Sequence, residues 1–187
     1  MAESTPPFEV AAREVSRAVL DYLIRYVGDP SVAEDLLQET LIRMSKGLAS
    51  FEGRASIKTW AFSIASRVAA DYRRRPDRQT RVVELEEAGA IADPAAGVGE
   101  RLVIDEMDAC IRRTIDTLPD SYRTALILHD LEGLTAEQVA KIGECSLATA
   151  KIRIHRARRR LKDALANRCT FYRDEDAVFR CDQKQNT

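Results

Sequence analysis

The sequence predicts an all-α protein of two small helical domains, joined by a flexible acidic linker and followed by a segment that resembles a short hairpin. Three observations support this. The chain of 187 residues is 32% charged and holds only 8 glycines and 6 prolines, a composition typical of helix-rich proteins. Apolar residues recur at spacings of three and four through most of the chain. Changes in pattern divide it into a first domain (8–75), a linker (76–100), a second domain (101–166) and a C-terminal extension (167–187).

The first domain carries helical spacing almost throughout, with its main breaks at residues 28–30 (GDP) and 51–53 (FEG). Ser31 is expected to cap the helix that begins at Val32. Leucine and methionine side chains are expected to form the buried face of this helix and to leave its acidic side chains exposed. The residues of that buried face are Leu36, Leu37, Leu41 and Met44.

The last helix of this domain is expected to run from about Ser56 to Tyr72. It stops at the sequence RRRP (73–76) because proline cannot continue a helix. The following residues, 76–100, are rich in Ala and Gly and hold six acidic side chains against two basic ones, a net charge of −4. The whole chain carries only −1. This segment is typical of a flexible linker, and the uneven charge predicts different partners for different segments.

The second domain begins with a helix that resumes near Glu100. Its expected core side chains are Leu102, Val103, Met107, Cys110, Ile111 and Ile115. The dipeptide Leu118-Pro119 then introduces a helix from Asp120 to Leu131. Gly133 is expected to close that helix in a left-handed conformation.

Two capped helices separated by a short break follow. Thr135 can cap the first, and Gln138 three residues later completes a capping box. The break is Gly-Glu-Cys at 143–145, and Ser146 is positioned to cap the next helix. One apolar stripe on that helix consists of Leu147, Ala150, Ile154, Ala157 and Leu161. This order of signals is typical of a helix-turn-helix whose second helix enters the major groove of DNA.

The second of these helices also concentrates positive charge. No acidic residue occurs between Cys145 and Lys162. The basic residues of this stretch are Lys151, Arg153, Arg156, Arg158, Arg159, Arg160 and Lys162. Such a helix suits the phosphate backbone of nucleic acid. The alternative is a solvated helix face whose last arginines interact with the helix dipole.

The N-terminal sequence MAESTPPFEV has neither a basic segment nor an apolar segment of the kind that directs secretion. No apolar run is long enough to span a bilayer. We therefore expect a cytoplasmic protein without membrane insertion. Its four cysteines are expected to be reduced thiols rather than a disulfide scaffold.

Taken together, these blocks resemble the bacterial extracytoplasmic-function (ECF) sigma factors of the sigma-70 family, over nearly all of residues 8–165. GDPSVAEDLLQET (28–40) resembles the polymerase-binding helix of the family. FEGRASIKTW (51–60), with Ile64-Ala65, resembles its promoter-melting segment. LPDSYR (118–123) and EGLT (132–135) lead into its helix-turn-helix. The resemblance implies that 8–75 is sigma region 2 and that 101–166 is sigma region 4.

For the first domain, the resemblance implies two surfaces. The expected contacts to core RNA polymerase are Glu34, Asp35, Gln38 and Glu39. An ordinary solvated acidic face is the alternative for this set. The expected contacts to the melted strand at the −10 element are Arg54, Ser56, Lys58, Thr59, Trp60 and Arg67. Splayed bases need aromatic stacking surfaces and cations. The alternative for both Trp60 and Phe51 is a place in the core. The arginines of 73–75 are expected to meet phosphates.

For the second domain, the resemblance implies that the recognition helix binds the −35 element as duplex DNA. The expected contacts are Thr149, Lys151, Ile152, Arg153, His155, Arg156 and Arg159. Arg and Lys can bind guanine edges, and an isoleucine can touch a thymine methyl group. Ala148-Thr149-Ala150 departs from the glycine and valine that many relatives carry, so the promoter sequence is not predicted. The resemblance also implies that the linker threads into the polymerase, a passive tether being the alternative, and that an anti-sigma factor is a partner.

The C-terminal extension carries two cysteines. A turn at Asp174–Asp176 would pair Phe171 with Phe179 and Cys169 with Cys181 on one face. Cysteines in that arrangement can form a disulfide or share a metal. The hypothesis is that Cys169 and Cys181 sense redox state or metal, and the alternative is a pair of reduced cysteines in a packed hairpin. A site that also included Cys145 is disfavoured, because the intervening helix separates it from Cys169 by on the order of 30 Å.

The sequence therefore predicts a sigma factor that directs core RNA polymerase to a restricted promoter set and helps to open the duplex. It is expected to respond to stress and to be regulated by an anti-sigma factor or by its own extension. No glycine-rich phosphate loop, paired-carboxylate motif or nucleophile signature occurs, so an enzyme is not expected. The alternatives are a dimeric helix-turn-helix repressor or activator, against which 33–40 and 51–60 argue, and a protein-interaction module, which leaves the cationic helix unexplained.

Overall fold

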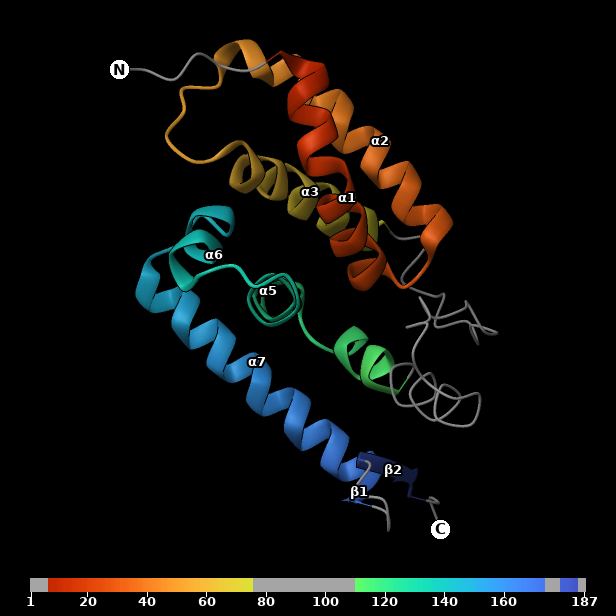
Figure 1. Ribbon diagram of the computed structural model, residues 1–187. Helices are drawn as coiled ribbons and strands as arrows, with labels where there is room; N and C mark the ends of the chain where they lie inside the picture. The colour runs from red at the N-terminus through yellow and green to blue at the C-terminus, as the bar shows by residue number, and fades with distance from the viewer. Residues whose placement is uncertain (1–6, 76–109, 174–178, 185–187) are drawn as a thin grey trace.

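The computed structural model describes residues 7–75, 110–173 and 179–184. Its first part is a bundle of α1 (Phe8–Val27), α2 (Pro30–Gly47) and α3 (Ile57–Arg74), with a short 3-10 turn, η1 (Leu48–Ser50), after α2. The helices α1, α2 and α3 all contact one another, and Figure 1 shows them as one compact group. We call this group the N-terminal bundle.

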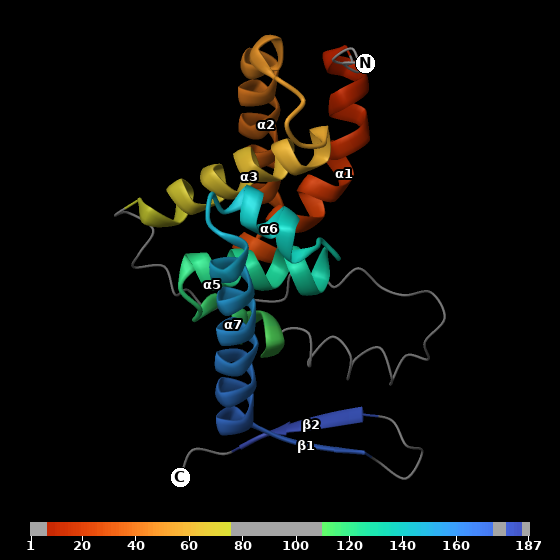
Figure 2. The ribbon, with the colours of Figure 1, turned by 90° about the vertical axis from the view of Figure 1, so that its left-hand side faces the viewer.

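The second part begins with a helix over residues 110–116. It continues with α5 (Asp120–Leu126), the π-type turn η3 (Ile127–Leu131), α6 (Ala136–Ile142) and the long helix α7 (Leu147–Arg168). We call these elements the C-terminal bundle. An antiparallel hairpin of β1 (Cys169–Arg173) and β2 (Phe179–Gln183) follows α7 directly, at the end of that helix farthest from the N-terminal bundle (Figure 2). The prediction of a helical fold ending in a hairpin is confirmed. The predicted linker and the core candidates of 101–109 lie outside the described residues.

The helix starts follow the predicted caps with one exception. Thr135 and Gln138 form both hydrogen bonds of the capping box, and Ser146 accepts a hydrogen bond from the Thr149 amide at 3.1 Å. The prediction for Ser31 is wrong. Asp29 caps α2 instead, because its carboxylate accepts from the amides of Ser31 and Val32 at 2.9 and 3.2 Å. The helix therefore begins at Pro30, and proline is favoured at the first position of a helix.

The two bundles pack against each other and share one apolar core. Tyr22 and Phe62 meet edge to face within the N-terminal bundle, with ring centroids 5.6 Å apart. Ile127 and Leu128 of η3 are completely buried. Contacts run from α3 to α6 and from α1 to η3. In this structure the two predicted domains are thus in direct contact.

Arg123 of α5 lies at the joint between the bundles and is completely buried. Its Nε donates to the Ile115 carbonyl oxygen at 3.2 Å, and its Nη2 donates to the carbonyl oxygens of Asp116 and Leu118. The guanidinium also lies over the ring of Tyr26 in α1, 5.4 Å from its centroid. Burial, together with the neighbouring Arg73 cation, lowers the pKa of Arg123. A buried cation held by several carbonyl oxygens fixes the path of the chain between 115 and 123.

Ion pairs between the bundles surround this joint. Arg73 at the end of α3 reaches Asp116 and Asp120, at 3.6 and 3.4 Å. Arg25 of α1 pairs with Glu132. The expectation that the arginines of 73–75 face phosphates is thus not met by Arg73 in this conformation, because two carboxylates of the C-terminal bundle hold it.

The hairpin register differs from the prediction by two residues. Phe171 lies opposite Cys181, and Cys169 lies opposite Gln183. The predicted pairing of Cys169 with Cys181 is therefore wrong. The reason is that β1 ends at Arg173 and β2 begins at Phe179, so the connection is longer than the three-residue turn that was assumed.

Candidate nucleic-acid interface

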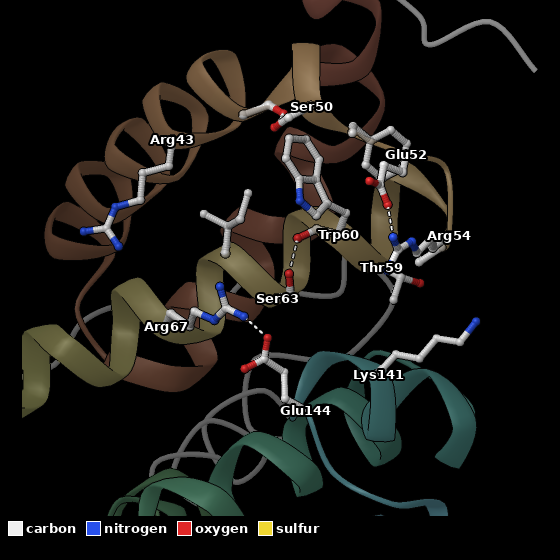
Figure 3. A pocket seen from close by; sticks show the side chains of 14 residues that line it. Arg43, Ser50, Glu52, Arg54, Thr59, Trp60, Ser63, Arg67, Lys141 and Glu144 are labelled. Carbon is white, nitrogen blue, oxygen red and sulfur yellow. Dashed lines mark hydrogen bonds and ion pairs between the residues drawn. The ribbon is translucent and has the colours of Figure 1, made fainter.

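An open cleft of about 820 Å³ lies where the start of α3 approaches α6 and the turn before α7. Aromatic, hydroxyl and basic side chains line it (Figure 3). Most of its walls come from α2, η1 and the segment 51–67. Lys141 and Glu144 close its other side from the C-terminal bundle. Most of the residues predicted to contact a melted strand are thus brought together around one cavity.

The aromatic part of the cleft is a pair of rings. Phe51 and Trp60 have centroids 5.0 Å apart and planes tilted by 37°. Both are half-buried, and Trp60 also packs on the core. A side chain at Gly47 would approach the indole closely, since a Cβ there would lie 3.1 Å from Cζ2. The backbone at Gly47 therefore packs against the indole, and part of both rings faces the cleft.

The polar residues at the start of α3 divide into two groups. Ser56 caps the helix, because its hydroxyl accepts from the Thr59 amide at 3.1 Å. Thr59 is buried, so its predicted contact with DNA is not available in this conformation. Arg54 is exposed and pairs with Glu52, while the Lys58 ammonium lies 5.9 Å from the centroid of the Phe62 ring.

Arg67 lies farther along α3 and pairs with Glu144, which belongs to the turn before α7 (Figure 3). The side chains are 56% and 68% exposed, so this is a surface ion pair, worth little by itself. Its position matters more than its strength. It joins a residue predicted to bind the melted strand to the C-terminal bundle. Sequence reasoning missed Lys141 and Glu144, since nothing in their local pattern points to α3.

On α7 the predicted apolar stripe is confirmed except at its first residue. Ala150, Ile154 and Ala157 are buried, while Leu147 is 37% exposed. The predicted DNA contacts occupy the other faces of the helix. Exposed members are Lys151, Ile152, His155, Arg156 and Arg159, and half-buried members are Thr149 and Arg153. The recognition helix thus presents a continuous basic surface with one isoleucine in its first half.

The arginines toward the end of α7 have structural partners. Arg158 donates to both carboxylate oxygens of Asp130 in η3. The Arg160 guanidinium lies 5.0 Å from the centroid of the Tyr122 ring. Arg159 is 3.9 Å from Asp163 on the same helix. The cationic helix therefore has one part that docks it on the bundle and another part that faces outward.

The predicted polymerase-binding residues lie on the outer face of α2. Glu34, Asp35 and Gln38 are exposed. Glu39 is half-buried and accepts from Nε of Arg43 at 2.7 Å. The helix buries Ala33, Leu36, Thr40 and Met44 on its opposite face, so its acidic residues are available to a partner.

Among the residues that the structure describes, no group of three or more His, Cys, Asp or Glu side chains is placed to hold a metal ion. Cys169 is buried, and its thiol faces Cys110 of the helix at 110–116. Cys181 is half-buried on β2. Within the same described part of the chain, no helix combines the length and the apolar character needed to cross a membrane.

Comparison with known proteins identifies both bundles. Residues 11–79 match the family described as Sigma-70 region 2, and residues 108–161 match Sigma-70, region 4. The chain is 30% identical over 165 residues to the RNA polymerase sigma-H factor of Pseudomonas aeruginosa, covering 84% of this chain and 86% of that protein. It is 31% identical over 158 residues to the ECF RNA polymerase sigma-E factor of Escherichia coli strain K12, covering 81% and 82%.

Two solved structures are similar in fold. The sigma factor RpoE in complex with the anti-sigma factor NepR from Bartonella quintana gives a TM-score of 0.65 at 25% identity, covering 85% of this chain and 96% of that one. CnrH in complex with the cytosolic domain of CnrY gives 0.59 at 19% identity, covering 86% and 95%.

Proposed function

This chain belongs to the sigma-70 family, among its ECF sigma factors, and from that premise we propose how it selects and opens promoters. It directs RNA polymerase to a restricted set of promoters. The observation that carries this function is the presence of region 2 and region 4, in that order, in one chain. A dimeric repressor or activator would need only the helix-turn-helix of region 4. It would have no use for the basic and aromatic cleft of region 2.

The roles divide between the two bundles. The exposed face of α7 reads the −35 element as duplex, and Arg156 and Lys151 supply cations for base edges and phosphates. The cleft at the start of α3 holds splayed bases of the −10 strand, with Trp60 as the stacking surface. The acidic face of α2 binds core polymerase. The protein acts by binding alone, in the cytoplasm, and itself catalyses no change of covalent bonds.

Regulation by an anti-sigma factor is part of this proposal. The support is the similarity to RpoE, whose structure was solved with the anti-sigma factor NepR. A role in response to stress is also part of this proposal, as expected for an ECF sigma factor, the class to which the named relatives belong.

The packing of the two bundles adds a conformational step. Elements named for positions −10 and −35 are separated by about 25 base pairs, on the order of 80 Å at 3.4 Å per base pair. In the structure, Arg67 of the −10 surface touches Glu144, three residues before α7 begins. The whole of α7 spans roughly 33 Å at 1.5 Å per residue. Both surfaces can therefore engage one promoter only after the bundles separate.

The function is tested by run-off transcription with purified core polymerase over a library of promoter fragments. We expect transcripts from a small set of promoters that share two elements at fixed spacing. Polymerase without this chain serves as the control. Failure of the chain to bind sigma-free polymerase, or binding only to palindromic duplex without transcription, would contradict the proposal.

The conformational step is tested separately with the double variant Arg67→Cys, Glu144→Cys. A cross-linker that carries two maleimides on a spacer with a cleavable disulfide should join the bundles and abolish run-off transcription, and a reductant should restore it. Each single variant and the wild type, treated alike, control for effects of the native cysteines. Full transcription from the cross-linked protein would show that the bundles need not separate, while leaving the assignment as a sigma factor intact.

A further inference from the structure

Cys110 and Cys169 form a pair of thiols at the base of the C-terminal bundle. Their Sγ atoms are 3.2 Å apart, and the two residues are only 6% and 2% exposed. Cys110 belongs to the helix at 110–116, and Cys169 is the residue at which α7 ends and β1 begins. The contact thus joins the first described helix of the C-terminal bundle to the hairpin at its other end.

The hairpin register places Cys181 diagonally from Cys169 rather than directly opposite it. Phe171 lies opposite Cys181, so Cys169 and Cys181 are diagonal neighbours on one face. Diagonal positions of an antiparallel pair are separated by about 7–8 Å between Cα atoms. That separation exceeds the range at which disulfides usually form, roughly 4.4–6.8 Å. Cys110 instead approaches Cys169 from the adjoining helix.

We propose that Cys110 and Cys169 are a redox site that forms a reversible disulfide. A hydroperoxide is the oxidant: one thiol, as its thiolate, attacks the peroxide oxygen, and the O–O bond breaks to give a sulfenic acid and an alcohol or water. The second thiol then attacks the sulfenic sulfur, the S–S bond forms, and water leaves. Two thiols lose two electrons and two protons, and the peroxide takes up both. A small thiol reductant reverses the bond by exchange.

The surroundings of the Cys169 thiol determine how fast it is oxidised. Burial, reinforced by the neighbouring Cys110 and Cys181 thiols, raises the pKa of Cys169 to about 11. A thiol is reactive only when it is deprotonated, so the Cys169 thiol reacts slowly at neutral pH and faster as pH rises. Slow oxidation distinguishes such a site from an exposed, rapidly reacting cysteine.

The bond would enclose the whole helix-turn-helix. The two cysteines are separated by 59 positions in the sequence, and α5, η3, α6 and α7 all lie between them. A cross-link over a loop of this length removes much of the freedom of the unfolded chain. We expect the oxidised form to melt at least about 5 °C above the reduced form.

The site is tested with the full-length protein and hydrogen peroxide. Trypsin cuts after lysine and arginine, so the four cysteines fall in four separate peptides: 102–112, 142–151, 169–173 and 181–184. Mass spectrometry without reductant should find 102–112 joined to 169–173, two hydrogens lighter than the separate peptides. The thermal midpoint should rise on oxidation and return when a thiol reductant is added.

Matched variants separate this pairing from the alternatives. Cys145→Ser and Cys181→Ser should keep both the cross-link and the rise in melting temperature, while Cys110→Ser should lose both. If Cys110→Ser does not fold, Cys110→Ala provides the same comparison. A cross-link between 169–173 and 181–184, or thiols that peroxide leaves free, would overturn the proposal. So would one equivalent of zinc that stays with the reduced protein through gel filtration after incubation with zinc chloride.

Discussion

The helices α3 and α7 start with the same local structure and meet different surroundings. Ser56 and Ser146 each cap a helix by accepting from the amide of a threonine three residues later, at 3.1 Å in both cases. In both, the serine and threonine hydroxyls are 2.9 Å apart. Yet Thr59 is buried while Thr149 is half-buried, and the cleft beside α3 is closed on one side by the other bundle.

This difference shows that helix formation and presentation of the surface are separate properties. The first half of α7 has an outward face on which Ile152 is 49% exposed. The corresponding part of α3 faces a cleft that Glu144 and Lys141 help to enclose. In this conformation the proposed duplex-reading surface is accessible, and the proposed surface for the melted strand is partly covered. Five experiments test this difference between the two helices.

The largest effect on unfolding free energy is expected from Arg123→Ala. This change removes the buried cation that lies where the two bundles meet. The change leaves the Ile115 and Leu118 carbonyl oxygens without their donor. Breaking a buried charge network of this kind costs about 3–5 kcal/mol of unfolding free energy. Urea unfolding measures it, and Arg113→Ala, at an exposed position of the neighbouring helix, is the control. A loss below about 1 kcal/mol would mean that the joint does not depend on Arg123.

Arg156→Ala should weaken binding of α7 to duplex DNA and leave binding to the melted strand unchanged. Loss of a cation that contacts a base edge costs about 1–3 kcal/mol, or roughly 5- to 150-fold in affinity for duplex DNA. Fluorescence anisotropy with the selected −35 duplex measures it, and single-stranded −10 DNA should bind as before. Lys162→Ala, an exposed cation on the same helix, should have a smaller effect and a similar one on every sequence.

Trp60→Leu should impair promoter melting, which depends on the cleft at the start of α3, and leave binding of α7 to duplex DNA unchanged. Leucine keeps apolar packing beside Phe51 but removes the flat surface for a base, and stacking is worth about 1–3 kcal/mol per base. We expect open-complex formation on duplex promoters to slow by about tenfold and to recover in part on a template with a premelted −10 bubble. Equal loss on both templates would place the indole in the core rather than at the DNA.

Ser56→Ala and Ser146→Ala compare the two matched caps directly. Removal of a serine cap costs about 1 kcal/mol, and equal geometry predicts nearly equal losses of unfolding free energy. Ser50→Ala, an exposed serine that caps neither helix, is the control. A loss that is much larger at Ser56 would show that the contact between the bundles adds to the cap there.

The smallest effect is expected from pH. Burial raises the pKa of Glu132 above its ordinary value, while the attraction of Arg25 lowers it by less. Both the burial and the contact with Arg25 result from the packing of η3 against α1. If separation of the bundles exposes Glu132, the packed state binds its proton more tightly than the open state does. Lower pH, from about 8 to about 5, therefore favours the packed state, and higher pH favours opening.

Small-angle scattering at each pH measures this shift, and Glu132→Gln should reduce the dependence on pH. Burial also raises the pKa of Asp116, so that residue contributes in the same direction. A more open molecule at low pH would contradict the prediction.

Much of this protein could be predicted from local sequence. The capping box at Thr135, the cap at Ser146, the left-handed Gly133 and the buried Ala150, Ile154 and Ala157 all agree with the structure. Each depends on residues within about four positions of one another, which is the range over which a helix makes its own hydrogen bonds. The errors at Ser31 and in the hairpin are also local, and each came from choosing one of two nearby residues or registers.

Other features were decided only by the tertiary structure. Arg25 and Glu132 are 107 positions apart, Arg67 and Glu144 are 77 apart, and Cys110 and Cys169 are 59 apart. No helical spacing links such pairs, because they meet only when apolar faces of separate helices pack together. Local sequence is enough to predict which helices form and which of their faces are apolar or charged. Packing of the two bundles determined which charged face is covered, and packing within the C-terminal bundle placed Cys110 beside Cys169.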